Sequence, residues 1–432
     1  MTMMFRSLST TNYRIWAGGA LVSNVGTWMQ RTAQDWLVLT VLTRNNAVAM
    51  GIVMALQFGP QLVLLPVTGL AADRLDRRRL LMATQSGMGI LGLGLGVLTV
   101  TGYVQLWQVY IFALALGIVA AFDAPVRQTF VSNLVGGKNL SNAVALNAAS
   151  FNVARMIGPA VAGLLTAAVG AGWVFLINAA TFGAVLISLT TLRRNQLFHD
   201  DHSRKSRGSL TSGFRYVWHR PDIMTLLIMT FLIGTFGLNF PIFISTMSVS
   251  VFHKGAGEYG LLSSTMAVGS VAGALLAARR AQPRIALLFA GSALFGFGCA
   301  LAGIMPNYIL FGIVLVGIGI AAQTLTTTAN GAVQLATDPA LRGRVMAIYM
   351  AIFMGGTPIG APITGWVADT FGPRWALGVG AAAGFVAALV GLGYLIRYRG
   401  LRIRLIENRP RVITSPPPTI PAEEAGRIVH GT

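Results

Sequence analysis

The sequence is poor in charged residues and has a single cysteine. Charged residues make up 10% of the 432 residues, whereas they make up about a quarter of soluble globular proteins. Cys299 stands alone, so no disulfide framework is available. The segment Gly136-Gly137-Lys138-Asn139 does not complete a phosphate-binding loop, so direct ATP drive is unsupported. We expect neither an enzyme nor a resident cofactor.

Histidine is also scarce and badly placed for chemistry. All five histidines lie in the expected loops or the tail, at His199, His202, His219, His253 and His430. None of them can join a metal cluster or a buried proton relay, because such sites need ligands or carriers gathered inside the fold. The sequence therefore predicts no metal site.

Long apolar runs dominate the chain. Hydrophobic residues make up 54% of it, and its mean hydropathy is +0.66. A membrane helix needs about twenty apolar residues, and backbone polar groups in hydrocarbon must be paired internally. The sequence therefore predicts an all-α membrane protein with twelve transmembrane helices, at about residues 14–42, 48–70, 80–101, 104–126, 140–168, 172–192, 223–250, 258–278, 285–304, 308–334, 345–369 and 375–397.

Basic residues outnumber acidic ones by 32 to 13, which gives a net charge of +19. Such a charge can indicate nucleic-acid binding, but the cations lie between the apolar runs, so we expect no nucleic-acid partner. The outer loops contain only Arg44, Lys254 and Arg374 as cations when the N-terminus is placed inside. This asymmetry predicts a multi-pass protein of the inner (cytoplasmic) membrane with both termini cytoplasmic. The basic N-terminal segment lacks a small-residue cleavage site, so we expect a retained first helix rather than a signal peptide.

The longest polar interruption, residues 193–222, separates six predicted helices from six. Two short patterns recur at one offset: Ile157 to Gly163 matches Ile359 to Gly365, and Gly170 to Trp173 matches Gly372 to Trp375. Paired halves of this kind are typical of transporters with a substrate site at mid-depth. We expect two pseudo-symmetric six-helix bundles at residues 1–195 and 223–398, joined by a cytoplasmic loop at residues 196–222. Residues 399–432 are expected to form a basic, Pro-rich cytoplasmic tail that is disordered.

The loop between the second and third predicted helices reads Gly69-Leu-Ala-Ala-Asp73-Arg74-Leu-Asp76-Arg77-Arg78-Arg79. Gly69 would let helices approach closely, Asp73 could pair with cations or cap a neighbouring helix, and Arg77 could reach a carboxylate. The loop resembles the signature of the major facilitator superfamily, with Asp76 where that signature has glycine. The resemblance implies the major facilitator fold and a cytoplasmic gate that stabilises the outward-facing state, formed by Gly69, Asp73, Arg74, Arg77 and Arg78. The alternative is a basic loop that only sets the topology.

The fifth predicted helix contains Arg155, Gly158, Pro159 and Gly163. Pro159 removes a helix hydrogen bond and kinks the chain, while the small residues permit close packing, which suits a rocking interface. The segment resembles the antiporter motif of the drug:proton branch, with alanine replacing two glycines. Gly and Pro are also common in membrane helices generally, so a plain packing role stays open.

Ionisable groups inside the predicted helices are few, and such groups are usually functional. Arg31 and Asp35 lie one turn apart on one face of the first helix. In one reading, Asp35 carries the coupled proton, while Arg31 and Arg155 attract an anionic or amphiphilic substrate. In the other, Arg31 and Asp35 form a permanent pair that only positions the helix. Asp123 is a second proton-coupling candidate, with a structural pairing to Arg77 or Arg127 as its alternative.

Polar and aromatic side chains add candidates for the lining of a substrate cavity. Each polar one suits a helix–helix hydrogen bond equally well, and each aromatic one a packing role. The polar candidates are Asn24, Gln34, Gln57, Asn239 and Gln323, with Gln30 and Asn330 as neighbours, and the aromatic ones are Trp28, Trp36, Phe58 and Phe240.

The stretches Asp338 to Ala347 and Ser212 to Tyr216, together with the two motifs above, are similar to one branch of the superfamily. That branch includes the enterobactin exporter and macrolide efflux pumps, also called transmembrane secretion effectors, and the similarity runs over about residues 5–397. It implies a proton-coupled exporter of drugs, siderophores or other amphiphilic metabolites, for which we expect alternating access and a monomer. The expected partners are a small-molecule substrate and the lipid bilayer, with the proton gradient as the energy source. A lipid or metabolite flippase or importer of the same fold, and a non-transporting membrane receptor, are the alternatives.

Overall fold

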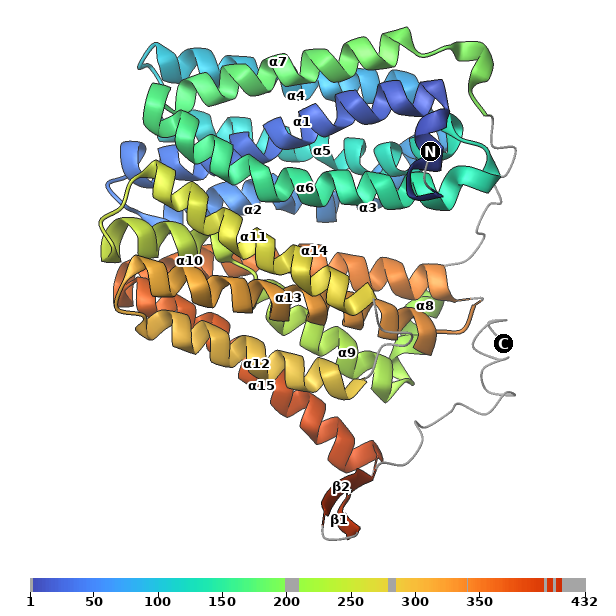
Figure 1. The fold of residues 1–432 in the computed structure, drawn as a ribbon, viewed down its shortest axis with the longest axis vertical. Coiled ribbons are helices and arrows are strands. Elements are labelled where there is room, and N and C mark those ends of the chain that lie inside the picture. Colours follow the sequence, from blue (N-terminus) through green and yellow to red (C-terminus); the bar gives the residue numbers. More distant parts are fainter. Residues whose placement is uncertain are drawn as a thin grey trace. The chain divides into compact units, whose positions relative to one another are not determined.

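Apolar runs become helices along almost the whole chain (Figure 1). The computed structural model describes residues 3–198, 210–278, 285–339, 341–399, 402–406 and 409–413. The elements up to the end of the sixth predicted span are η1 (Met3–Ser9), α1 (Thr11–Trp36), η2 (Leu37–Leu42), α2 (Ala47–Val63), α3 (Leu65–Arg74), α4 (Arg77–Val100), α5 (Leu106–Leu134), α6 (Gly137–Val169), α7 (Ala171–Thr191) and η3 (Arg194–Gln196). The later ones are α8 (Leu210–Trp218), α9 (Pro221–Leu232), η4 (Ile233–Gly237), α10 (Phe240–Thr246), η5 (Met247–Val251), α11 (Ala256–Ala278), α12 (Ile285–Ile304), α13 (Tyr308–Ala336), α14 (Arg342–Phe371), α15 (Pro373–Arg399), β1 (Arg402–Ile406) and β2 (Arg409–Ile413).

Nine helical segments within the described residues are long and apolar enough to cross a membrane. Two further apolar helices, Ala47–Val63 and Leu288–Ile304, are shorter. Each of the twelve predicted spans falls on a helix of the structure, since α1 with η2, α2 with α3, and α12 account for the remaining three. The predicted all-helical membrane fold is confirmed.

The chain divides into two compact units. Unit 1 comprises Met1–Arg204, Phe240–Val268 and Ala361–Pro373, and unit 2 comprises Lys205–Asn239, Gly269–Gly360 and Arg374–Thr432. In unit 1, α1 packs against α6 and α7, α4 packs against α5 and α7, and α2 packs against α5 (Figure 1). In unit 2, α13 packs against α12 and α9. The division at residues 196–222 expected from the sequence stays a prediction.

The two matched turn segments adopt the same backbone conformation. Gly170 follows α6 with φ of +89°, and Gly372 follows α14 with φ of +100°. A residue with a side chain is strained at such angles, whereas glycine is not. In both places the next helix begins at the following residue. The glycines of the two turns, 202 residues apart (372 − 170), therefore share a positive φ, which agrees with the repeat in the sequence.

An arginine joins α8 to the first turn of α9 in unit 2. Arg220 donates two hydrogen bonds to the carboxylate of Asp222, at 2.9 and 2.6 Å, and one to the hydroxyl of Tyr216 at 2.9 Å. The hydrogen bonds with Asp222 raise the pKa of Arg220, which lies just outside the membrane-spanning segment. The charged end of this helix is thereby neutralised locally.

The start of the C-terminal tail differs from the expected disorder. Residues of β1 and β2 pair antiparallel, with Arg402 opposite Ile413 and Ile406 opposite Arg409. β1 reads Arg-Ile-Arg-Leu-Ile and β2 reads Arg-Pro-Arg-Val-Ile, and the β-branched Ile and Val residues favour the extended backbone. The Pro-rich remainder of the tail, from residue 414, lies outside the described residues.

Candidate functional site

Arg31 and Asp35 lie one turn apart near the end of α1, within unit 1. The guanidinium of Arg31 stands over two aromatic rings, 4.8 Å from the centre of Phe58 and 5.4 Å from that of Trp28. Its Nε has no hydrogen-bond acceptor among the described residues. Arg31 and Asp35 are close enough to attract each other, but the aromatic rings, rather than a closed ion pair, hold the guanidinium.

Asp35 is a buried carboxylate in an aromatic environment. It is 6% exposed, and in the described part of the chain no hydrogen bond to it is recorded. Its neighbour Trp36 stacks on Tyr259 of α11, with ring centres 5.8 Å apart and planes inclined by 21°. Tyr259 is buried, lies near enough to interact with the charge of Asp35, and hydrogen-bonds to Ser263. Sequence reasoning missed Tyr259, because nothing local marks its approach to α1.

Two glutamines add unpaired donors to this part of unit 1. Gln34 lies beside Asp35 on α1, and Gln57 precedes Phe58 on α2. Both are almost fully buried, and neither side-chain nitrogen has a hydrogen-bond partner in the described residues. A buried donor without an acceptor costs about 1–3 kcal/mol, so these groups suit contact with water or a polar ligand. Arg155 is half-buried on α6, and among the described residues no hydrogen bond or ion pair to it is recorded.

Asp123 lies at the centre of a saturated polar network. Its carboxylate accepts hydrogen bonds from Thr84 at 2.8 Å, Gln85 at 2.6 Å and Arg127 at 3.0 Å. Arg127 in turn donates to Asn24 at 2.8 Å. This network joins α1, α4 and α5 and favours a structural role for Asp123, with Arg127 as its partner. Asn24, a cavity candidate from the sequence, also belongs to it.

The other polar candidates make hydrogen bonds within or between helices. Asn178 donates to Gln30 at 2.5 Å, Asn239 donates to the backbone of Thr235, and Gln323 donates to Thr327. Gln334 donates to Asn330. Phe240 packs edge-on against Phe243. Among the described residues, the sequence candidates without side-chain hydrogen bonds are therefore Arg31, Asp35, Gln34, Gln57 and Arg155.

The basic residues of the predicted gate hold helix ends together in unit 1. Arg77 donates to the side-chain oxygen of Asn133 at the end of α5, at 2.9 Å. Arg78 donates to the carbonyl groups of Leu189 and Thr190 at the end of α7. Cations are favourable there, because the last carbonyl groups of a helix carry partial negative charge.

In this loop, Asp76 has a local structural role, whereas Gly69 does not make the close helix contact that the sequence predicts. Asp76 accepts a hydrogen bond from the backbone N–H of Arg79 and caps the N-terminus of α4, so aspartate has a local role where the family signature has glycine. A Cβ atom at Gly69 would meet no other described atom within 4 Å, so the expected close helix approach is absent there. The helix end at Gly69 is exposed in this conformation. Arg74 is exposed as well, and the side chain of Asp73 lies outside the described residues.

The motif of the fifth predicted helix marks two close contacts of α6. A Cβ atom at Gly158 would lie 2.5 Å from Cβ of Trp28 on α1, and one at Gly163 would lie 2.9 Å from Cα of Gly260 on α11. The helix continues across Pro159, whose carbonyl group faces Gly260. Ser264 of α11 also donates to the backbone of Met156. The small residues therefore permit helix contact, as the sequence predicts.

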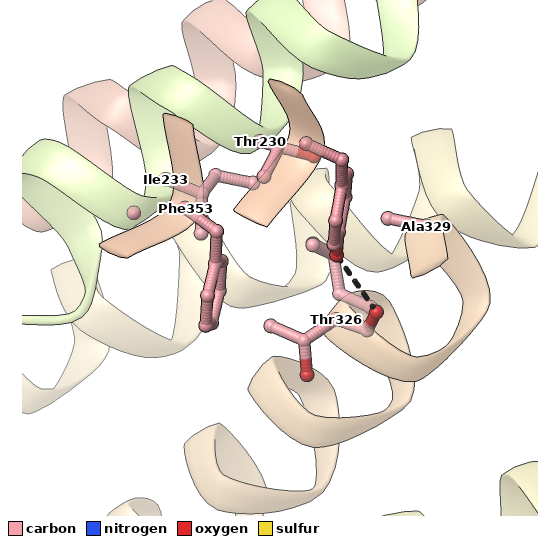
Figure 2. A pocket seen from close by; sticks show the side chains of 8 residues that line it. Thr230, Ile233, Thr326, Ala329 and Phe353 are labelled. Carbon is pink, nitrogen blue, oxygen red and sulfur yellow. Dashed lines mark hydrogen bonds between the residues drawn. The ribbon is translucent and has the colours of Figure 1, made fainter. Parts of the chain in front are cut away.

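A hollow in unit 2 lies between α9 with η4, α13 and α14. Figure 2 shows Thr230 and Ile233 on one side, Phe353 beside them, and Thr326 and Ala329 on α13. The hydroxyl group of Tyr349, which also lines it, donates to the carbonyl of Thr326 at 3.4 Å. None of the described residues that line this hollow is charged, so they offer no carboxylate as a proton carrier.

The comparisons with known proteins agree with one another. The sequence profile of a family described as "Transmembrane secretion effector" matches residues 3–404. The chain is 28% identical over 353 residues to the staphyloferrin A transporter of Staphylococcus aureus, covering 81% of this chain and 87% of that protein. It is 26% identical over 371 residues to the multidrug efflux pump Tap of Mycolicibacterium fortuitum (82% and 88% covered). It is 27% identical over 369 residues to the enterobactin exporter EntS of Shigella flexneri (84% and 86% covered).

Solved structures show the same fold at low identity. A bacterial homologue of the human lysosomal transporter Spinster, in an inward-facing and occupied conformation, superposes with a TM-score of 0.70 at 15% identity, covering 89% of this chain and 96% of that one. A mutant of the nucleoside transporter NupG superposes with a TM-score of 0.72 at 12% identity, covering 89% and 99%.

Proposed function

The chain belongs to the transmembrane secretion effector family, and on this premise we propose that it exports amphiphilic small molecules in exchange for protons. Family membership confirms the resemblance that the loop and helix motifs suggest, and with it the major facilitator fold. The protein is a multi-pass membrane transporter that exports small molecules, not an enzyme. The coupling ion, the binding residues and the substrate class are our proposal.

The observation that carries the coupling is the environment of Asp35. A buried carboxylate without hydrogen bonds is unfavourable when ionised, because the bilayer and the protein interior solvate charge poorly. Two partners can relieve this: a proton, or an N–H or O–H group of the substrate. Protonation removes the negative charge that attracts a donor group of the substrate, so the proton and the substrate compete for Asp35. Such competition between proton and substrate is what the exchange of one for the other requires.

The substrate's own acceptor atoms have partners in the same region. The guanidinium of Arg31 and the amides of Gln34 and Gln57 are buried donors, and Phe58 and Trp28 offer aromatic faces. Arg155 of the same unit is a further candidate for the lining, whereas Asn24, Asn239 and Gln323 take part in hydrogen bonds of their own. A substrate that combines donors, acceptors and apolar surface fits this set, and the drug and siderophore relatives support such a class.

Transport then follows alternating access. Residues 1–195 rock against 223–398, the loop containing Gly69, Asp73, Arg74, Arg77 and Arg78 closes the cytoplasmic side, and α6 slides at Gly158, Pro159 and Gly163. Protonation of Asp35 from outside neutralises its carboxylate and permits the return of the empty carrier. The positive-inside pattern supports an inner-membrane location with both termini cytoplasmic. We expect a monomer to suffice, because each chain holds a complete set of these residues.

A resistance screen tests the proposal. An efflux-deficient strain that overexpresses the protein is challenged with dyes, antibiotics and siderophores, with and without an uncoupler. We expect lower accumulation of at least one amphiphile, and an uncoupler should abolish the difference. In proteoliposomes, the purified protein should then move that compound when a pH gradient is imposed across the membrane, because protons that flow down the gradient drive the exchange. If the protein lowers accumulation of the compound as much with the uncoupler as without it, transport is not coupled to protons.

A further inference from the structure

The N-terminus of α2 is capped by a carboxylate from the distant end of α14. One oxygen of Asp369 accepts a hydrogen bond from the backbone N–H of Ala47 at 2.7 Å, and the other accepts from Val48 at 2.9 Å. Asn46 accepts from Ala49 at 2.8 Å. The first N–H groups of a helix have no partner inside it. Two of the first three backbone N–H groups of α2 therefore have their acceptor on Asp369, which lies 322 positions after Ala47 in the sequence.

Glycines bring the two backbones together beside this carboxylate. A Cβ atom at Gly365 of α14 would meet the carbonyl oxygen of Ala47, and one at Gly51 of α2 would lie 2.5 Å from the carbonyl oxygen of Ala361. Any side chain at these positions would push the helices apart. All these residues belong to unit 1. We call this contact, between residues 47–51 of α2 and residues 361–369 of α14, the outer contact.

At the other end of the α2–α3 segment, the same spacing of glycine and aspartate occurs, but its glycine makes no close helix contact. Gly69-Leu-Ala-Ala-Asp73 lies near the end of α3, and Gly365-Trp-Val-Ala-Asp369 lies near the end of α14. Both segments have glycine four residues before aspartate. Gly365 is packed against a helix backbone, whereas Gly69 has no other described atom within 4 Å of its Cβ position. One glycine–aspartate helix end is closed on a partner, and the glycine of the other is open.

We propose that Asp369 holds the outer side of the transporter closed, and that the outer contact opens each time substrate leaves. This inference rests on the alternating access proposed above. The N-terminus of a helix carries about half a positive charge, which a carboxylate stabilises without needing a cationic side chain. The bidentate cap keeps the closed state favoured while leaving it separable, since loss of a helix cap shifts an equilibrium about tenfold. Asp369 is a positioning residue for the gate and touches no substrate.

A labelling experiment measures the opening directly. Met50 is fully buried one turn inside α2, beneath the outer contact. Met50→Cys in a Cys299→Ser background provides one thiol, which a membrane-impermeant maleimide added outside reaches only when the outer side opens. We expect Asp369→Ala to raise the labelling rate about tenfold, and Asp369→Asn, which keeps one acceptor oxygen, to raise it less.

The matched control removes a comparable cap elsewhere. Asn307 caps α13 by accepting a hydrogen bond from the N–H of Leu310 at 2.9 Å, and Asn307→Ala should leave the labelling of Met50→Cys unchanged. Equal rates for Asp369→Ala, Asp369→Asn and the parent would overturn the proposal, as would an equal rise in the Asn307 control. If Asp369→Ala does not reach the membrane, Asp369→Asn alone decides. Labelling needs neither substrate nor a proton gradient, so its failure is distinguishable from failure of proton-coupled export.

Discussion

The guanidinium of Arg31 lies 4.8 Å from the centre of the Phe58 ring, on a neighbouring helix of the same unit. A desolvated contact of this kind contributes about 2 kcal/mol. It holds the cation away from a closed pair with Asp35, and so leaves the carboxylate available to a proton or a substrate. The aromatic ring therefore separates two charges that the spacing along α1 alone would bring together.

Replacing the ring should close the pair. In Phe58→Leu the apolar volume is kept but the π face is lost, so Arg31 turns to Asp35 and competes with both proton and substrate. We expect the rate of proton-coupled efflux to fall about tenfold, which corresponds to about 1.4 kcal/mol. Phe151→Leu, which alters an aromatic contact of Trp28 without touching Arg31, is the control and should retain most activity. Equal losses in the two variants would show that general packing, not the cation contact, matters.

Asp35→Asn should uncouple transport from protons. The amide cannot ionise, so it mimics the protonated residue at every pH, and substrate export should no longer draw protons inward. A pH-sensitive dye inside proteoliposomes measures the proton flux that accompanies substrate movement. Asp35→Glu keeps a titratable group and should retain partial coupling. Unchanged proton flux in Asp35→Asn would refute the assignment and shift attention to Asp123.

Asp123→Ala should act on stability rather than on coupling. Three donors, on Thr84, Gln85 and Arg127, lose their acceptor, and the mostly buried guanidinium of Arg127 loses its counter-charge. Breaking a buried pair by removing one partner costs about 3–5 kcal/mol, so the midpoint of thermal unfolding in detergent should fall clearly. Asp123→Asn keeps an acceptor oxygen, so its midpoint of thermal unfolding should fall less. Loss of proton flux in a fully stable Asp123→Asn protein would contradict the structural role.

Much of the fold follows from local sequence, because apolar length alone specifies a membrane helix and cation placement its ends. The same applies to the small residues of α6, whose role depends only on their lack of a side chain. Side-chain partners do not follow. Arg31 has Asp35 one turn away but stands over the ring of Phe58, and Arg77 donates to the amide oxygen of Asn133 on another helix. These choices depend on which distant helices pack together, which the spacing along one helix does not encode.

Asp76 illustrates the intermediate case. A departure from a family signature reads in the sequence as a weakened match, yet in the structure it provides the N-cap of α4. Aspartate is a preferred N-cap residue, and glycine is only slightly worse. The substitution therefore exchanges one acceptable cap for another, and the loop keeps its form. This capping role follows from local sequence alone, because Asp76 directly precedes the first residue of α4.

The contact of Gly163 with α11 supplies the last prediction. A Cβ atom there would lie 2.6 Å from the carbonyl oxygen of Ala256 and 2.9 Å from Cα of Gly260, both backbone atoms that cannot rotate away. In Gly163→Val the two helices must separate, so the close packing that accompanies this conformation is lost, and we expect transport to fall at least about tenfold while the protein still reaches the membrane. Gly183→Ala, on α7, places its Cβ in open space and should transport normally. Efflux from the two variants at matched membrane levels checks the prediction, and normal transport by Gly163→Val would mean that the helix contact is dispensable.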